Sequence, residues 1–188
     1  MSGNPRAKII FLHGASSSGK STLARSLQQR IEEPFWHYSI DHLRDSGVLP
    51  LERVKRGEFA WSDLRMPFFD GFHRSIGAFL AAGNNLILEH IIEADSAAAF
   101  REQLAALLRP YDVFFVGVHC SLEELVRREQ QRGDRPGGSA EADFHRVHQG
   151  LRYDFEVDAE AGPDENTARL LAAWRRRAGP SLLFSPRG

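Results

Sequence analysis

The sequence has very little cysteine and no strong excess of either charge. Its 188 residues include a single cysteine, Cys120, and carry a formal net charge of −1 at pH 7. One cysteine excludes an intramolecular disulfide, which fits a reducing compartment. A net charge close to zero gives no global indication of nucleic acid or an anionic membrane as a partner, so any basic chemistry must be local. We therefore expect neither nucleic acid nor membrane as a partner.

Long hydrophobic runs are also missing. The apolar run near the amino terminus extends only from Ile9 to Leu12, which is too short for a signal-peptide core or a membrane span. We expect a cytoplasmic protein. Hydrophobic residues make up 42% of the chain and charged residues 26%, as is usual in globular proteins. The length predicts a single domain over residues 1–188.

Zinc-ligand spacing is absent as well. The chain has eight histidines, among them His145 and His148 on one predicted helix and His119 next to Cys120. No second pair of ligands stands at the spacing that zinc sites show. We interpret these histidines as structural or polar-site residues and predict no zinc site.

The chain does contain a regular alternation of strand and helix patterns. Such alternation predicts an α/β fold of three layers, with helices on both faces of a parallel sheet. The expected strands are 8–13, 35–40, 86–92, 112–120 and 153–157, and the expected helices are 20–32, 67–82, 96–108, 121–131, 140–149 and 165–177.

A phosphate-binding loop follows the first predicted strand and opens the first predicted helix. The segment GASSSGKS matches G-x-x-x-x-G-K-[ST]. The glycines permit a loop whose N–H groups surround a phosphate, the lysine adds a positive charge, and the last serine is a ligand for Mg²⁺. The alternative is a Gly/Ser turn without function. The predicted nucleotide-binding residues are Gly14, Ala15, Ser16, Ser17, Ser18, Gly19, Lys20, Ser21 and Thr22.

Two acidic residues belong to predicted strands or follow them: Asp41 stands directly after the second strand, and Glu89 lies inside the third. Because ligands bind beyond the carboxyl ends of parallel strands, both should lie at the same edge as the phosphate-binding loop. Asp41 is our candidate general base, and the alternative is an N-cap of a helix starting at His42. Glu89 is a candidate for Mg²⁺, through water, or for a bond to the loop. A structural salt bridge is the equally weighted alternative.

Arginines and aromatic residues mark two further segments. Arg132 and Arg135 flank a glycine-rich loop and predict a lid over residues 127–139 that stabilises charge during phosphoryl transfer. We expect Arg127 and Arg128 to lie on a solvent-exposed helix face without a catalytic role. The same interpretation is the alternative for Arg132 and Arg135. Residues 42–82 are the expected acceptor-binding segment, with Phe59 and Trp61 as candidate pocket residues.

Several of these segments together resemble the chloramphenicol phosphotransferase-like family of P-loop kinases. The serines before Gly19-Lys20, Asp41 at a strand end and the run RGDR at 132–135 match the family's pattern. The segment VHQGLRYDFEVD, residues 147–158, is similar to the family's V-H-x-G followed by Y-D-x-E-V-D. The resemblance covers residues 8–160. Departures occur at His90, at Ala159 and in the segment 45–67.

This resemblance implies a nucleoside-monophosphate-kinase-like fold with five parallel strands and a small lid. It also implies an ATP- and Mg²⁺-dependent phosphotransferase with Asp41 as catalytic residue. The acceptor would be a hydroxyl of a small molecule, either an antibiotic such as chloramphenicol or a related metabolite. A kinase for a nucleotide, a sugar acid or a shikimate-like compound stays open. So does a nucleotide-dependent switch or binding module.

Overall fold

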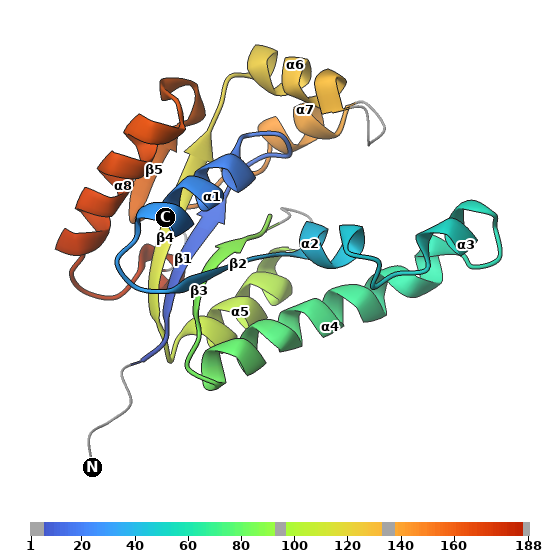
Figure 1. Cartoon of the computed structure of the whole chain (residues 1–188), viewed down its shortest axis with the longest axis horizontal. Coiled ribbons are helices and arrows are strands. Elements are labelled where there is room, and N and C mark those ends of the chain that lie inside the picture. The colour runs from blue at the N-terminus through green and yellow to red at the C-terminus, as the bar shows by residue number, and fades with distance from the viewer. Residues whose placement is uncertain (1–5, 93–96, 133–137, 186–188) are drawn as a thin grey trace.

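The fold is a parallel sheet with helices on both faces (Figure 1), as the sequence predicts. A computed structural model describes residues 6–92, 97–132 and 138–185; of residues 97–101, Arg132 and Ser139 it describes the backbone alone. The strands are β1 (Lys8–His13), β2 (Phe35–Ser39), β3 (Asn85–Glu89), β4 (Asp112–His119) and β5 (Phe155–Asp158). Their order is β2-β3-β1-β4-β5, and every pair is parallel.

Eight α-helices are described around this sheet. They are α1 (Lys20–Arg30), α2 (Ile40–Asp45), α3 (Leu51–Lys55), α4 (Trp61–Ala81), α5 (Ala97–Leu108), α6 (Leu122–Arg132), α7 (Ser139–Phe144) and α8 (Pro163–Arg176). Two short 3₁₀ helices, η1 (Ala159–Ala161) and η2 (Leu182–Phe184), complete them. Within the described ranges, no helix is both long and apolar enough to cross a bilayer.

The hydrophobic core has two layers because successive strand residues point to opposite faces. On one face, Ile10 and Leu12 pack against Leu27 of α1 and Leu170 of α8. On the other face, Phe11 and its neighbours pack against α4 and α5. The central strand β1 is apolar on both sides and has residues 9–13 fully buried, as a strand covered by two helical layers requires.

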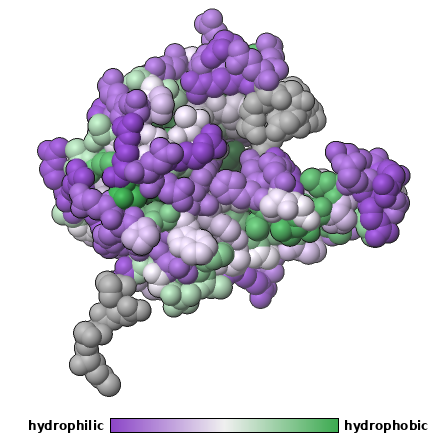
Figure 2. Space-filling view, in the orientation of Figure 1, coloured by the Kyte–Doolittle hydropathy of each residue, from purple (hydrophilic) through white to green (hydrophobic). Residues whose placement is uncertain are grey.

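Helix α4 starts six residues earlier than the sequence predicts. Pro67 was expected near the first turn, but it lies inside a helix that begins at Trp61. Only the carboxyl-terminal half of α4 covers the sheet, where Phe72, Ile76 and Leu80 are buried. The other half projects with α2 and α3 as an arm, which is hydrophilic at its tip and more hydrophobic along its stem (Figures 1 and 2). Gly83, with a φ of 89°, follows the helix end, as the sequence predicts.

Other expected boundaries are also wrong, and the third strand, expected to extend to residue 92, ends at Glu89. The helix expected over 140–149 ends at Phe144 and continues as turns to Gly150, which has a positive φ. The fifth strand starts at Phe155 instead of residue 153. At Asp154 the backbone N–H donates to the carbonyl oxygen of Phe115 at 2.8 Å, but the N–H of Phe115 donates to the side-chain Oδ2 of Asp154, at 2.7 Å, instead of to a backbone carbonyl.

Asp154 therefore connects the start of β5 to β4 and to the carboxyl-terminal segment. Its carboxylate accepts from the N–H of Phe115, from the hydroxyl of Ser181 at 2.5 Å and from the N–H of Leu182 at 2.7 Å. Hydrogen bonds to a charged acceptor contribute more than neutral ones, and removing the acceptor leaves its donors unpaired.

We expect Asp154→Ala to lower the free energy of unfolding by ~2–4 kcal/mol, measured by urea denaturation. The matched control is Asp70→Ala, which removes an exposed carboxylate paired with Arg74. An exposed ion pair is worth ~0–1 kcal/mol. Equal effects of the two substitutions would contradict the anchoring role of Asp154.

Candidate active site

The phosphate-binding loop connects β1 to α1 at the carboxyl edge of the sheet, as the motif predicts. Gly14 is required because a Cβ there would lie 2.3 Å from the carbonyl oxygen of Val118 on β4. Gly19 is required because its φ is +95°, a conformation that residues with a Cβ rarely adopt. The first turn of α1 contains no acidic residue. The loop and the positive end of the helix dipole therefore favour an anion.

Lys20 holds its ammonium group over this loop. The Nζ atom donates to the carbonyl oxygens of Gly14 at 2.9 Å and Ala15 at 2.6 Å. A positive charge next to a helix amino terminus is otherwise unfavourable, so these carbonyls compensate for it. The charge is thus placed where a bound phosphate would lie.

Glu89 connects the sheet to the loop and to the neighbouring strand. Its side chain is 6% exposed; Oε2 accepts from the hydroxyl of Ser21 at 2.9 Å, and Oε1 contacts Nε2 of His37. Burial alone raises the pKa of the Glu89 carboxyl. The interactions with His37, Lys20 and Ser21 outweigh this effect and lower the pKa below its ordinary value. Both alternatives are therefore present, a bond to the loop and an ion-pair partner.

The loop and the acidic residues border one cavity of about 820 Å³. One end lies beside α1, α6 and α8, and the other lies between α2, α4 and the end of β3. The lining includes six of the nine predicted nucleotide-binding residues, together with Asp41 and Glu89. Its other charged or aromatic residues are Arg25, His42, Arg44, Asp45, Phe69, His90 and Arg128.

Asp41 lies in the cavity wall, but it does not cap a helix. Helix α2 begins at Ile40, and its N-cap is Ser39, whose hydroxyl accepts from the N–H of Asp41 at 3.1 Å. The expected alternative, an N-cap for a helix from His42, is wrong because Asp41 is already inside the first turn. Its carboxylate pairs with Arg44 at 3.1 Å.

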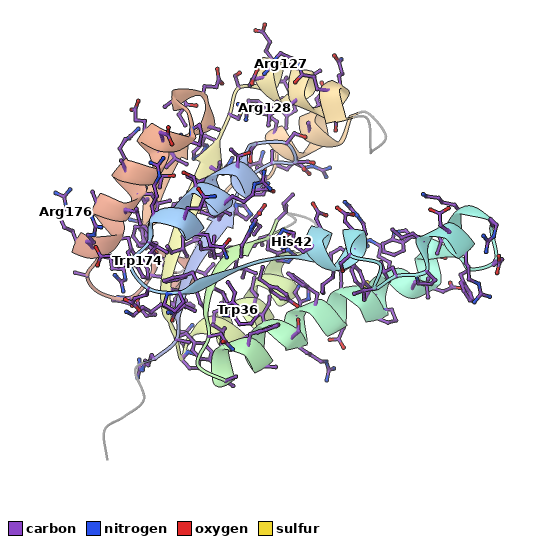
Figure 3. The ribbon with its side chains drawn as sticks, viewed as in Figure 1. Trp36, His42, Arg127, Arg128, Trp174 and Arg176 are labelled. Carbon is purple, nitrogen blue, oxygen red and sulfur yellow. The ribbon has the colours of Figure 1, made fainter. Side chains whose placement is uncertain are left out.

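Of the two arginines expected on a solvated face of α6, one lies there and the other lines the cavity. Arg127 is 54% exposed and pairs with Glu124, as expected for a solvated face. Arg128 instead lines the cavity, and its Nη1 would lie 3.1 Å from a Cβ on Gly19. Figure 3 shows Arg127 on the outer side of α6 and Arg128 on the side that faces α1. Arg135 and the side chain of Arg132 lie outside the described residues, so their roles stay predictions.

The aromatic residue of the acceptor end is Phe69, not Phe59 or Trp61. Phe69 lines the cavity on α4, whereas neither of the two expected residues does so. The guanidinium carbon of Arg53 lies over the Phe59 ring, 4.3 Å from the ring centre. The expectation was wrong because α4 extends beyond the sheet and carries its first turns away from the site.

A buried hydrogen-bond chain supports the loop from below. The N–H of Ile92 donates to Nε2 of His13, so the proton of this neutral ring is on Nδ1 and is donated to the hydroxyl of Tyr153 at 3.0 Å. That hydroxyl donates in turn to Nδ1 of His148 at 2.6 Å. The ring of Tyr153 lies against Gly117, where a Cβ would approach it to 2.7 Å.

The helix after the predicted lid contacts the loop directly. Oδ2 of Asp143 on α7 accepts from the N–H of Ser16 at 2.9 Å. Together with the His13–Tyr153–His148 chain, this bond connects residues 143–153 to the last residue of β1, His13, and to Ser16 in the loop. Sequence reasoning missed Asp143, Arg128 and His37. The V-H-x-G and Y-D motifs marked the region, but no local pattern paired these residues with the loop.

Comparison with known proteins defines the class and then the family. An APS kinase of Mycobacterium tuberculosis in complex with AMPPNP and APS has 17% identity and a TM-score of 0.63, over 91% of this chain and 99% of that one. A gluconokinase of Sinorhizobium meliloti has 20% identity and a TM-score of 0.61, over 92% and 94%. The fold is therefore that of P-loop kinases.

The sequence places the chain more narrowly. Residues 7–175 match the family described as chloramphenicol phosphotransferase-like protein, and the chain belongs to this family. It is 34% identical to a Mycobacterium tuberculosis protein named a putative O-phosphotransferase, over 91% of this chain and 83% of that protein. The chain is thus a P-loop phosphotransferase.

Buried histidines should make stability depend on pH. Burial, followed by the charge of His119, lowers the pKa of His148 to about 4, and burial with the charge of His73 lowers that of His90 to about 3. Between these values and the ordinary 6.5, the unfolded chain binds protons that the folded chain does not. The stabilisation is complete above pH 6.5 and decreases as the pH falls below it.

We expect the free energy of unfolding to decrease between about pH 6.5 and about pH 4.5, measured by urea denaturation. His148→Gln should make this dependence shallower. The control is His145→Gln, because the His145 ring is exposed on the turn after α7. The same slope in the wild type and in His148→Gln would refute the assignment.

Proposed function

We propose that this protein is an ATP- and Mg²⁺-dependent phosphotransferase that acts on a hydroxyl of a small molecule. One observation carries the proposal: Lys20, Ser21 and Glu89 share a single cavity with Asp41. The first three form a nucleotide-phosphate end, and Asp41 stands where an acceptor hydroxyl would enter.

The oxygen atoms of Ser21 and Glu89 fit a magnesium site. Mg²⁺ prefers oxygen ligands and usually keeps several waters, so a hydroxyl and a nearby carboxylate are a suitable protein contribution. The two oxygens lie 2.9 Å apart at the first turn of α1. When bound, the ion would neutralise charge on the β- and γ-phosphates.

The residues of the chain have separable roles in the proposed reaction. The loop N–H groups and Lys20 bind the phosphates, and Arg128 lies over Gly19, where it can stabilise charge on the phosphates. Asp41 accepts the proton of the acceptor hydroxyl as its oxygen bonds to the γ-phosphorus and the bond to the β–γ bridging oxygen breaks. The products are ADP and the phosphorylated acceptor.

The charges at the acceptor end favour an uncharged acceptor. Arg44 is the arginine there, and it already pairs with Asp41 at 3.1 Å and with Asp45 at 2.7 Å. His90 is neutral near pH 7, since its pKa is about 3. A phosphate- or carboxylate-bearing acceptor beside α2 would meet two carboxylates and one arginine, and Arg25 of α1 also lines the cavity.

The other basic residues of the expected acceptor segment lie outside the cavity lining, and one of them, Arg65, packs over the ring of Phe69, 5.2 Å from the ring centre. Arg53 and Arg56 pair with Glu58, and Lys55 pairs with Glu52, all on the arm and outside the cavity lining. This arrangement supports a neutral hydroxyl compound, such as an antibiotic or a related metabolite, over a nucleotide, sugar acid or shikimate-like acceptor. A panel of both kinds with ATP, read by mass spectrometry for a phosphate adduct, tests the choice.

Substituting Lys20 tests the nucleotide end. We expect Lys20→Ala to lower ADP formation by ~10²–10⁴-fold and to weaken ATP binding, because a charge-assisted contact to the phosphates is lost. The control is Lys55→Ala, which removes an exposed ammonium on α3. ADP release measures turnover, and circular dichroism checks the fold. Wild-type turnover in Lys20→Ala would refute the nucleotide site.

Substituting Asp41 tests the acceptor end. We expect Asp41→Asn to bind ATP normally and to lose acceptor phosphorylation by ~10²–10⁴-fold, because the amide cannot accept the hydroxyl proton. Its stability should change by less than ~1 kcal/mol, since an exposed ion pair contributes little.

The matched control for Asp41→Asn is Arg44→Gln, which breaks the same ion pair and keeps the carboxylate. If Arg44→Gln lost as much transfer as Asp41→Asn, the ion pair would matter and Asp41 would not be the base. ADP release with and without acceptor separates kinase activity from the slow basal hydrolysis of a nucleotide-dependent switch.

A further inference from the structure

Three potential metal ligands converge beside the first turn of α1. Among the described residues, His37 on β2, His42 on α2 and Glu89 on β3 offer donor atoms that all lie within 4.8 Å of one another. His37 and Glu89 are both buried, with 7% and 6% of their side chains exposed. No zinc-type spacing is visible in the sequence, because the three potential ligands come from three separate elements.

The sheet register explains the convergence. His37 is paired with Ile87 and Ser39 with Glu89, so His37 and Glu89 are diagonal neighbours on the same face. Helix α2 starts directly after β2 and returns His42 to this position, with its ring centre 4.4 Å from that of His37. Figure 3 shows His42 between α2 and the end of β3. The backbone therefore sets this group of three in place.

The donor set suits a different ion from Mg²⁺. Two imidazole nitrogens and one carboxylate oxygen are typical ligands of Zn²⁺, whereas Mg²⁺ prefers oxygen. Ligand atoms of a tetrahedral zinc ion lie about 3.3 Å apart, given bonds of ~2.0–2.1 Å. Donor atoms within 4.8 Å reach that separation by small side-chain rotations.

The surroundings already orient two of the three ligands. The His42 ring packs edge-on against the His37 ring, with an angle of 79° between the two ring planes. Ser21 donates to Oε2 of Glu89, and Oε1 faces His37. Bonds of this kind from a ligand's far side commonly fix the ligands of metal sites.

We propose that His37, His42 and Glu89 form a binding site for Zn²⁺, and that zinc bound there inhibits phosphoryl transfer. Binding exchanges the proton between His37 Nε2 and Glu89 for the ion, and the proton leaves to solvent. Inhibition follows because the Glu89 carboxylate then binds zinc and is no longer available to the Mg²⁺ site that it would form with Ser21, and because His42 adjoins Asp41 on α2. The inhibition rests on the proposed function, whereas the binding does not.

Calorimetric titration of the metal-free full chain with Zn²⁺ tests the binding. We expect one site per chain that excess Mg²⁺ does not displace. His42→Ala, and separately His37→Gln, should weaken zinc binding by at least ~10–100-fold. Removing a residue that only hydrogen-bonds to a metal ligand already weakens metal binding by this factor, and these substitutions remove a ligand itself. His42 is an exposed residue, so its substitution should leave the fold intact, and circular dichroism checks this.

The controls are His145→Ala, on the exposed turn after α7, and His119→Ala, whose ring stacks on His148 at 4.0 Å. Wild-type zinc affinity in His42→Ala, or a loss of binding in either control, would overturn the site. A chain that binds no zinc also overturns it.

Enzyme assays at constant Mg²⁺ and ATP test the inhibition separately. We expect ADP release by the wild type to fall as buffered Zn²⁺ rises, and His42→Ala to require at least ~10-fold more zinc for the same fractional loss. Zinc that binds at His42 without lowering ADP release would overturn the inhibition and leave the site. A chain that binds zinc but forms no ADP under any condition would refute the proposed function instead.

Discussion

The buried carboxylate of Glu89 is the charge on which the candidate site depends. An unpaired carboxylate at 6% exposure would be strongly unfavourable, so its partners must be held in place. Those partners are Ser21 on α1 and His37 on β2, with the charge of Lys20 close enough to lower its pKa. One ionised group therefore connects the central sheet, an outer strand and the first turn of the phosphate-binding helix.

The phosphate-binding loop is constrained from the other side by packing. Gly14 lies so close to the carbonyl of Val118 that the loop is seated on β4. His13 continues this constraint through Tyr153 to His148, and Asp143 holds the N–H of Ser16. The segment that follows the predicted lid is thereby attached to the loop.

The two ends of the cavity have different electrostatic character. The nucleotide end combines loop N–H groups, the dipole of α1, Lys20 and Arg128, which together suit several negative charges. At the acceptor end, Arg44 is compensated by Asp41 and Asp45, and His90 is neutral. This difference is the basis of the proposal that a highly charged donor binds at one end and an uncharged acceptor at the other.

Local patterns in the sequence were sufficient for the sheet and for the phosphate-binding loop. Strands and helices alternate with clear periodicity, and the geometry of the loop is imposed by Gly19 and by Lys20 at the start of a helix. Asp41 and Glu89 could be assigned to one edge because parallel strands end on the same side. These features depend on neighbouring residues or on a general rule of topology.

Only the tertiary structure decided which distant residues meet. His37 and Glu89 are separated by 52 positions and His13 and Tyr153 by 140, and no periodicity links such pairs. The start of α4 was misjudged because Pro67 costs the helix one hydrogen bond, which the rest of a 21-residue helix can tolerate. That extension carried Trp61 away and left Phe69 in the cavity. Long-range packing energies, which a local pattern does not contain, determined each of these outcomes.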